Sequence, residues 1–108
     1  MIGNNIPNLV DKIIDRGVNY ISINFGAKEV DEGFEWSSII MSYVDFEYGK
    51  IVDAIVTYKF PNDKMQAVIN NYLLEPENEE YITAFNEMQA WRKEAKEIAK
   101  QALEYELH

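Results

Sequence analysis

The apolar residues in the second half of the chain recur at the spacing of an α-helix. Pro61 predicts a break before residues 63–74, because proline disfavours a helical conformation in the residue that precedes it. Asn62 or Asp63 is placed to cap a helix that starts there. Its apolar residues are separated by gaps of three and one, which is typical of a helix; they are Met65, Val68, Ile69, Tyr72 and Leu73. We therefore predict a short helix over residues 63–74.

A longer helical stripe follows, with Asn78 as the predicted cap. Glu79 and Glu80 lie in the first turn, where the helix dipole favours anions. The apolar residues then recur every three or four positions: Tyr81, Phe85, Met88, Trp91, Ala95, Ile98, Ala102 and Tyr105. A helix of this length is about 40 Å long, whereas a compact domain of this size is about 26 Å across. We therefore expect the helix to overhang its own core or to be covered by a partner.

The first half of the chain combines one helical segment with two alternating segments. Residues 1–7 are predicted to be a loose arm. A helix is predicted over residues 8–16, because an asparagine is placed to cap it and a glycine follows its end in the position of a left-handed residue. Residues 18–25 and 34–43 alternate between apolar and polar side chains, as half-buried strands do. The polar stretch 26–33 predicts a long loop, which makes the strands an antiparallel hairpin.

Residues 45–60 are open to two interpretations. Their composition of β-branched residues favours a strand, whereas the spacing of the same residues favours a helix. We follow the spacing and predict a helix over residues 46–59 with Asp45 as its cap, and keep a third strand as the alternative.

The chain is thus expected to form one α+β domain over residues 1–108: an N-terminal helix, a β-hairpin, and three helices ending in a long amphipathic C-terminal helix.

The net charge of −9 is concentrated in two segments. Residues 29–47 contain six acids and no base, and residues 75–80 contain four acids and no base. Such a field repels nucleic-acid phosphates and anionic membranes, and it suits either a basic protein partner or simple solubility. The basic residues of the last helix are interleaved with glutamates, which predicts an ordinary exposed face; they are Arg92, Lys93, Lys96 and Lys100. We expect neither a nucleic-acid partner nor a membrane partner.

Groups that could carry catalysis or bind a metal are sparse. Cysteine is absent, and the one histidine, His108, is the last residue, where a fraying terminus makes a poor general base. Ser37, Ser38 and Ser42 therefore have no histidine partner and are interpreted as strand residues. The acids do not match the pattern of a calcium-binding loop. We predict no catalytic residue, no metal and no cofactor.

The apolar stripe of the last helix is the candidate interaction surface. Aromatic residues are enriched at protein interfaces, so part of the stripe could line a ligand groove or a dimer seam; these residues are Tyr81, Phe85, Met88, Trp91 and Ile98. The alternative is that the same side chains form the core of the chain itself, as the apolar stripe of a helix usually does.

Residues 48–103 contain a set of positions that recurs in a known group of proteins: Lys59, Phe60, Asp63, Ala67, Val68, Ile69, Asn70, Asn71, Phe85, Trp91 and Lys96. At these positions the chain resembles the C-terminal half of small proteins encoded by phages and prophages. Those proteins show a helix that ends in Lys-Tyr or a similar pair, a turn with acids, a helix with Ala-(Ile/Val)-Ile, and a final helix with aromatic residues and lysine. Pro61, Asn62 and Lys64 depart from the pattern. The resemblance implies a phage-type origin and includes no catalytic motif.

Three functional hypotheses follow, in this order. The first is a non-enzymatic interaction or assembly protein that binds a protein partner or copies of itself through the last helix or a hairpin edge. The second is an acidic mimic that binds a basic host protein. The third is a metal-dependent carboxylate enzyme.

The first seven residues lack the basic and apolar regions of a signal peptide, so we expect a cytoplasmic or virion-associated location.

Overall fold

The computed structural model describes residues 2–3 and 5–107, and its fold belongs to the predicted α+β class. The strands come first along the chain and the helices follow. The strands are β1 (Ile2–Gly3), β2 (Val10–Asp15), β3 (Val18–Val30) and β4 (Gly33–Ser42). The helices are the short 3-10 helix η1 (Tyr43–Asp45) and the α-helices α1 (Tyr48–Lys59), α2 (Asn62–Leu74) and α3 (Glu79–Leu107).

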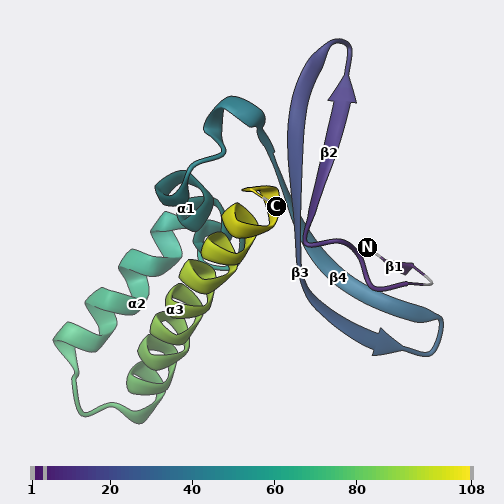
Figure 1. The fold of residues 1–108 in the computed structure, drawn as a ribbon. Helices are drawn as coiled ribbons and strands as arrows, with labels where there is room; N and C mark the ends of the chain where they lie inside the picture. Colours follow the sequence, from purple (N-terminus) through teal and green to yellow (C-terminus); the bar gives the residue numbers. More distant parts are fainter. Residues whose placement is uncertain (1, 4, 108) are drawn as a thin grey trace.

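The strands form one antiparallel sheet in the order β1-β4-β3-β2. The long strand β3 pairs with β2 over residues 18–23 and with β4 over residues 20–30. Its two hairpin ends therefore project in opposite directions, while the helices lie together on one side of the sheet (Figure 1).

The predicted N-terminal helix over residues 8–16 is wrong, because this segment contains strand β2. The turn between β2 and β3 consists of Arg16 and Gly17, whose φ angles are 53° and 79°. Positive φ at both central residues is what a tight two-residue hairpin turn requires. Val10 is buried whereas Ile14 is 75% exposed, so the apolar residues of this segment do not share one buried face.

The predicted long loop over residues 26–33 is also wrong. β3 runs through most of this stretch and pairs with β4, so the turn shrinks to residues 31–32. The pairing register shifts between Phe25 and Lys28, where Gly26 has a φ of 67°. The glycine therefore marks a bulge within a strand, where a local bend needs the left-handed conformation.

The predicted loose arm over residues 1–7 includes a strand. Ile2–Gly3 form β1 and pair with β4. A Cβ atom on Gly3 would lie 2.8 Å from the ring carbon Cη2 of Trp36, so the absence of a side chain lets β1 approach this ring. Positions 1 and 4, which belong to the predicted arm, lie outside the described residues.

The helix predicted over residues 46–59 is confirmed as α1, and the third-strand alternative is wrong. Its N-cap residue is Glu47, not the predicted Asp45. Asp45 instead accepts a hydrogen bond from Lys50 Nζ at 3.1 Å, and Glu47 Oε1 lies 3.6 Å from the same atom. The hydrogen bond with Asp45 and the negative charge of Glu47 raise the pKa of Lys50.

The two later helices occupy their predicted segments. Pro61 is the N-cap residue of α2, so Asn62 and Asp63 lie inside the helix and do not cap it. Asn78 caps α3 as predicted, because its Oδ1 accepts two backbone N–H groups of the first turn at 3.0 and 3.3 Å.

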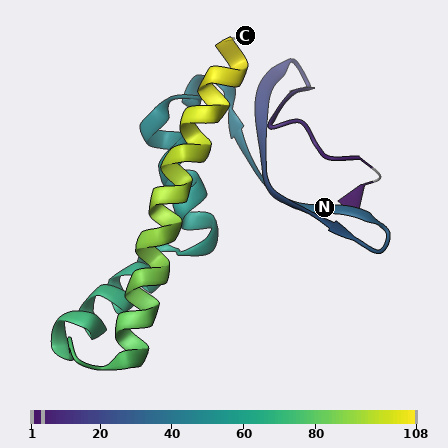
Figure 2. The ribbon, with the colours of Figure 1, turned by 60° about the horizontal axis from the view of Figure 1, so that its bottom comes forward.

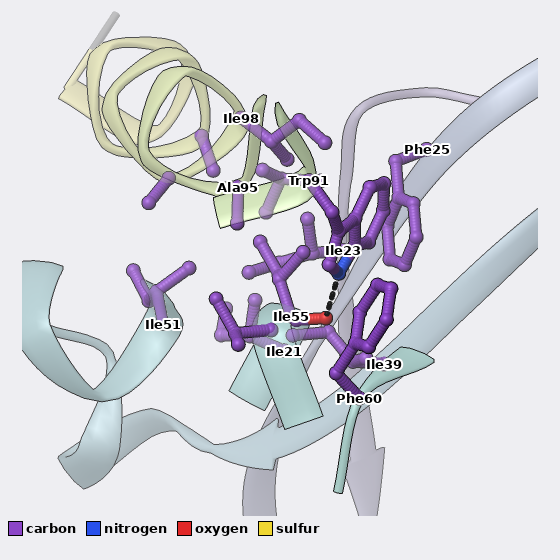
Figure 3. Close-up of a cluster of buried hydrophobic side chains, with 14 of the residues drawn as sticks. Ile21, Ile23, Phe25, Ile39, Ile51, Ile55, Phe60, Trp91, Ala95 and Ile98 are labelled. Atoms are coloured by element: carbon purple, nitrogen blue, oxygen red, sulfur yellow. Dashed lines mark hydrogen bonds between the residues drawn. The ribbon is translucent and has the colours of Figure 1, made fainter. Parts of the chain in front are cut away.

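The core lies between the helix-facing side of the sheet and the inner sides of α1 and α3 (Figure 3). The strand predicted over residues 18–25 is confirmed as part of β3, but it is not half-buried at its centre, because Ser22 and Asn24 are buried on one face and Ile21, Ile23 and Phe25 on the other. In β4 the buried residue is Ile39, and Ile40 is 65% exposed. Trp91 Nε1 donates a hydrogen bond to the backbone carbonyl of Ile55 at 3.1 Å, which ties α3 to α1. The core residues labelled in Figure 3 are Ile21, Ile23, Phe25, Ile39, Ile51, Ile55, Phe60, Trp91, Ala95 and Ile98.

The hairpin of α2 and α3 extends away from the sheet (Figure 2). α2 contains no buried residue, and the first buried residue of α3 is Met88. α3 therefore overhangs the core, as its length predicts. The Cα radius of gyration is 16.3 Å, against about 13 Å for a compact domain of this length.

Candidate interaction surfaces

The residues predicted to form an interaction surface lie mostly in the core of the chain itself. Met88 is fully buried, and Trp91 and Ile98 are each only 9% exposed. Tyr81 and Phe85 are half-buried on the part of α3 that packs against α2. A partner could reach the three buried residues only if the packed elements moved apart. The stripe therefore joins the elements of one chain, which was the alternative interpretation of its pattern.

The exposed surface of α3 separates into a basic strip and an acidic strip. Residues four apart in a helix lie above one another on the same side. The basic strip follows this spacing and consists of Arg92, Lys96 and Lys100, with Lys93 beside them. The acidic strip lies on the other side of the exposed surface and consists of Glu87, Glu94, Glu97 and Glu104. Lys93 and Lys100 each have a glutamate four residues further on, Glu97 and Glu104, so the two strips meet along one edge. The interleaving is therefore retained at this edge, and only Arg92 and Lys96 lie clear of the acids.

A groove of about 530 Å³ lies beside the basic strip, between α1, α2 and α3. We call it the helical groove. Its apolar lining comes from α1 and α2 and consists of Val52, Val56, Met65 and Ile69. Its charged lining consists of Arg92 and Lys96 from α3 and Asp53 from α1. The groove exists because α1 and α2 both pack on α3 while Pro61 turns the chain between them.

The cations of the helical groove are available to a ligand. Arg92 Nη1 lies 3.5 Å from Oε1 of Gln89, and both Arg92 and Lys96 are exposed. Neither cation forms an ion pair with a carboxylate in the described part of the chain. With Asp53 included, the lining has one excess positive charge in a protein whose net charge is −9. The groove is thus apolar and locally positive, which suits an apolar ligand with a negative charge.

The far end of the α2–α3 hairpin has the opposite charge. Leu73 and Leu74 end α2 and are 68% and 79% exposed. Glu75 follows them directly and Glu77 comes two residues later, and both are also exposed. We call these four residues the acidic tip. An aromatic pair, with one ring from each helix, stacks behind it with ring centroids 4.3 Å apart and supports this end of the hairpin.

The sheet face away from the helices contains a buried polar cluster around Asn24. Its Oδ1 accepts hydrogen bonds from the hydroxyls of Ser22 at 3.2 Å and Ser38 at 2.6 Å. Its Nδ2 donates to the backbone carbonyl of Asn8 at 2.7 Å and to Asp11 Oδ2 at 2.9 Å. The amide is thus fully hydrogen-bonded. We interpret the cluster as structural, because it holds the segment before β2 against β3.

The two hairpin ends of the sheet are exposed and differ in chemistry. The end formed by β2 and β3 presents Ile14, which is 75% exposed, and Val18, which is 45% exposed. β2 is also the outer strand on that side, so its free edge can pair with another strand. The end formed by β3 and β4 is acidic and carries exposed carboxylates at Glu29, Asp31, Glu32 and Glu35.

Within residues 2–3 and 5–107, no group of three or more acidic or histidine side chains is arranged to hold a metal ion. In the same ranges, no helix combines the length and the apolar character that a bilayer span requires. His108, the predicted terminal histidine, lies outside the described residues.

No protein-family model, no curated protein and no solved structure matches this chain. Functional inference therefore rests on the surfaces described above.

Proposed function

We propose that this chain is a non-enzymatic interaction and assembly protein that associates with copies of itself. The observation that carries the proposal is its open shape, in which two sheet hairpins and one helical hairpin project from a small core. A projecting hairpin buries little of its surface, and a small domain needs such burial for its stability. They are useful where other chains cover them.

The exposed area supports this proposal. A folded protein of 12.6 kDa exposes about 6,200 Å² on average, whereas this chain exposes 7601 Å². The difference of about 1,400 Å² is larger than the roughly 800 Å² that each partner buries in one protein–protein interface of standard size. Large exposed apolar side chains occur on two of the projecting hairpins: Ile14 and Val18 on the β2–β3 hairpin, and Leu73 and Leu74 on the helical hairpin.

The resemblance to phage- and prophage-encoded proteins is compatible with an assembly role. We include a phage-type origin and a cytoplasmic or virion-associated location in the proposal. Neither a nucleic acid nor a membrane is the proposed partner, because the acidic surface repels both.

Sedimentation velocity over a series of protein concentrations tests the proposal. We expect the mass in solution to rise above the 12.6 kDa of one chain as the concentration increases. A single species of one-chain mass at every concentration would show that self-association is wrong.

The acidic end of the β3–β4 hairpin favours a second candidate function, binding to a basic host protein. Its carboxylates are exposed, and the hairpin that carries them projects from the body of the sheet (Figure 1). The wild-type chain should retain a basic partner and release it at moderate salt. The variant Glu29→Gln/Glu32→Gln should not retain this partner. Retention that is unchanged by both salt and the variant would count against this candidate.

A further inference from the structure

We propose that copies of this chain associate head to tail, with the acidic tip of one copy inserted into the helical groove of the next. The inference rests on the proposed self-association and specifies its contact. The acidic tip is Leu73, Leu74, Glu75 and Glu77, and the groove is lined by Val52, Val56, Met65, Ile69, Arg92 and Lys96.

The apolar parts of the two surfaces match. Leu73 and Leu74 are adjacent, exposed and placed at a projecting end, so they present apolar surface that the chain itself does not cover. The groove has an apolar lining from α1 and α2 and is open to solvent. Transfer of the two leucine side chains from water into this lining is favourable because it removes apolar area from water.

The charged parts of the two surfaces match as well. Glu75 and Glu77 lie within three residues after the leucines, and Arg92 and Lys96 border the apolar lining. The helical groove is a positive site in a protein with a net charge of −9, whose excess acids are concentrated in residues 29–47 and 75–80. Charge complementarity therefore selects an acidic apolar segment, and the acidic tip combines both properties.

One chain cannot fill its own groove with its own tip. About 20 Å of α3 separates Glu79, next to the tip, from Arg92 at the groove. The tip ends the same packed helices, α2 and α3, that line part of the groove, so the two surfaces are held apart within one chain and reach each other only between copies. Such a contact uses different surfaces on the two partners, and it therefore builds a closed ring or an open filament.

The area is consistent with this arrangement. In a head-to-tail assembly each copy is covered twice, once at its tip and once at its groove. A standard interface buries about 800 Å² on each partner, so two such contacts cover about 1,600 Å² of each copy. This is close to the excess exposed area of the chain.

Charge-reversal variants test the contact. The groove variant Arg92→Glu/Lys96→Glu and the tip variant Glu75→Lys/Glu77→Lys each place like charges opposite one another. We expect each to weaken self-association by at least about tenfold in sedimentation velocity. The four changes combined in one chain restore opposite charges, and we expect them to restore association.

Matched controls carry the same charge changes elsewhere on the surface. Arg16→Glu/Lys28→Glu matches the groove variant, and Glu29→Lys/Glu32→Lys matches the tip variant. We expect both controls to associate like the wild type. Circular dichroism of every variant confirms that a loss of association is not a loss of folding.

The outcomes separate this inference from the proposed function. If the wild type associates and the groove and tip variants associate equally well, the head-to-tail contact is wrong while self-association stands. The contact is also wrong if the fourfold variant stays dissociated although it is folded. A wild type of one-chain mass at all concentrations overturns both.

Discussion

At the scale of single residues, this small protein depends on a few fully hydrogen-bonded polar groups. The side chain of Asn24 is 6% exposed and joins two serines of the sheet to the segment before β2. A buried polar group that loses its partner costs more than the hydrogen bond contributes. This cluster therefore determines how firmly the N-terminal segment stays on the sheet.

We expect Asn24→Leu to destabilise the protein by about 2–3 kcal/mol, because it removes the side-chain hydrogen bonds of the cluster and takes away the acceptor of the buried Ser22 hydroxyl. The free energy of unfolding in urea measures the effect. The matched control is Asn19→Leu in the same strand, where the side chain is exposed, and its effect should stay within about 0.5 kcal/mol. Equal losses in the two variants would contradict the role of the cluster.

The cap of α3 gives a second prediction at this scale. Asn78→Ala should cost about 1 kcal/mol of unfolding free energy, because two N–H groups of the first turn lose their acceptor. Asn78→Asp keeps an acceptor oxygen and should retain most of the stability. Asn71→Ala, on the exposed surface of α2, serves as the control in the same urea experiments. If Asn78→Ala matches this control, the cap does not contribute.

At the scale of elements, the first hairpin shows how one local signal can serve two structures. A glycine with positive φ ends many helices, and it also completes the tight turn of a hairpin. Gly17 fits both, and its φ of 79° does not distinguish them. The pairing of β2 with β3 decides, because it places Val10 in the core opposite Ile23.

Two glycines provide opposite predictions for the same substitution. Gly17→Ala should destabilise the protein by about 1–2 kcal/mol, since a side chain disfavours the left-handed conformation of the turn. Gly49→Ala in α1 should stabilise it by about 0.5 kcal/mol, because alanine is the better helix former and its Cβ would meet nothing within 4 Å. Thermal or urea unfolding measures both. A shift of the same sign in the two variants would contradict these conformations.

At the scale of the whole molecule, the projecting hairpins make the chain larger than its length requires. The groove variant Arg92→Glu/Lys96→Glu, proposed above to be dissociated, allows the shape of one copy to be measured. Small-angle scattering should give a radius of gyration near the Cα value of 16.3 Å and clearly above the roughly 13 Å of a compact domain. A radius of gyration near the roughly 13 Å of a compact domain would show that one copy does not have the excess exposed surface on which the proposed self-association rests.

Several features of this protein are determined by local sequence alone. The cap of α3, its apolar stripe, the helical character of α1 and α2, and the break at Pro61 are all predicted from residues within a few positions of one another. The spacing of Arg92, Lys96 and Lys100 four residues apart is also local, but the glutamates interleaved with these cations predicted an ordinary exposed face. Local spacing suffices here since a helix is held by contacts between near neighbours.

Only the tertiary structure decided the remaining features. Residues 10–15 became a strand, and residues 26–33 a bulged hairpin, because they pair with segments that the local pattern does not identify. The stripe around Trp91 is core and not interface because a sheet and α1 cover it. The helical groove draws its lining from three helices, so no single stretch of sequence contains it. Strand pairing, burial and grooves all depend on contacts between distant residues, which local periodicity does not encode.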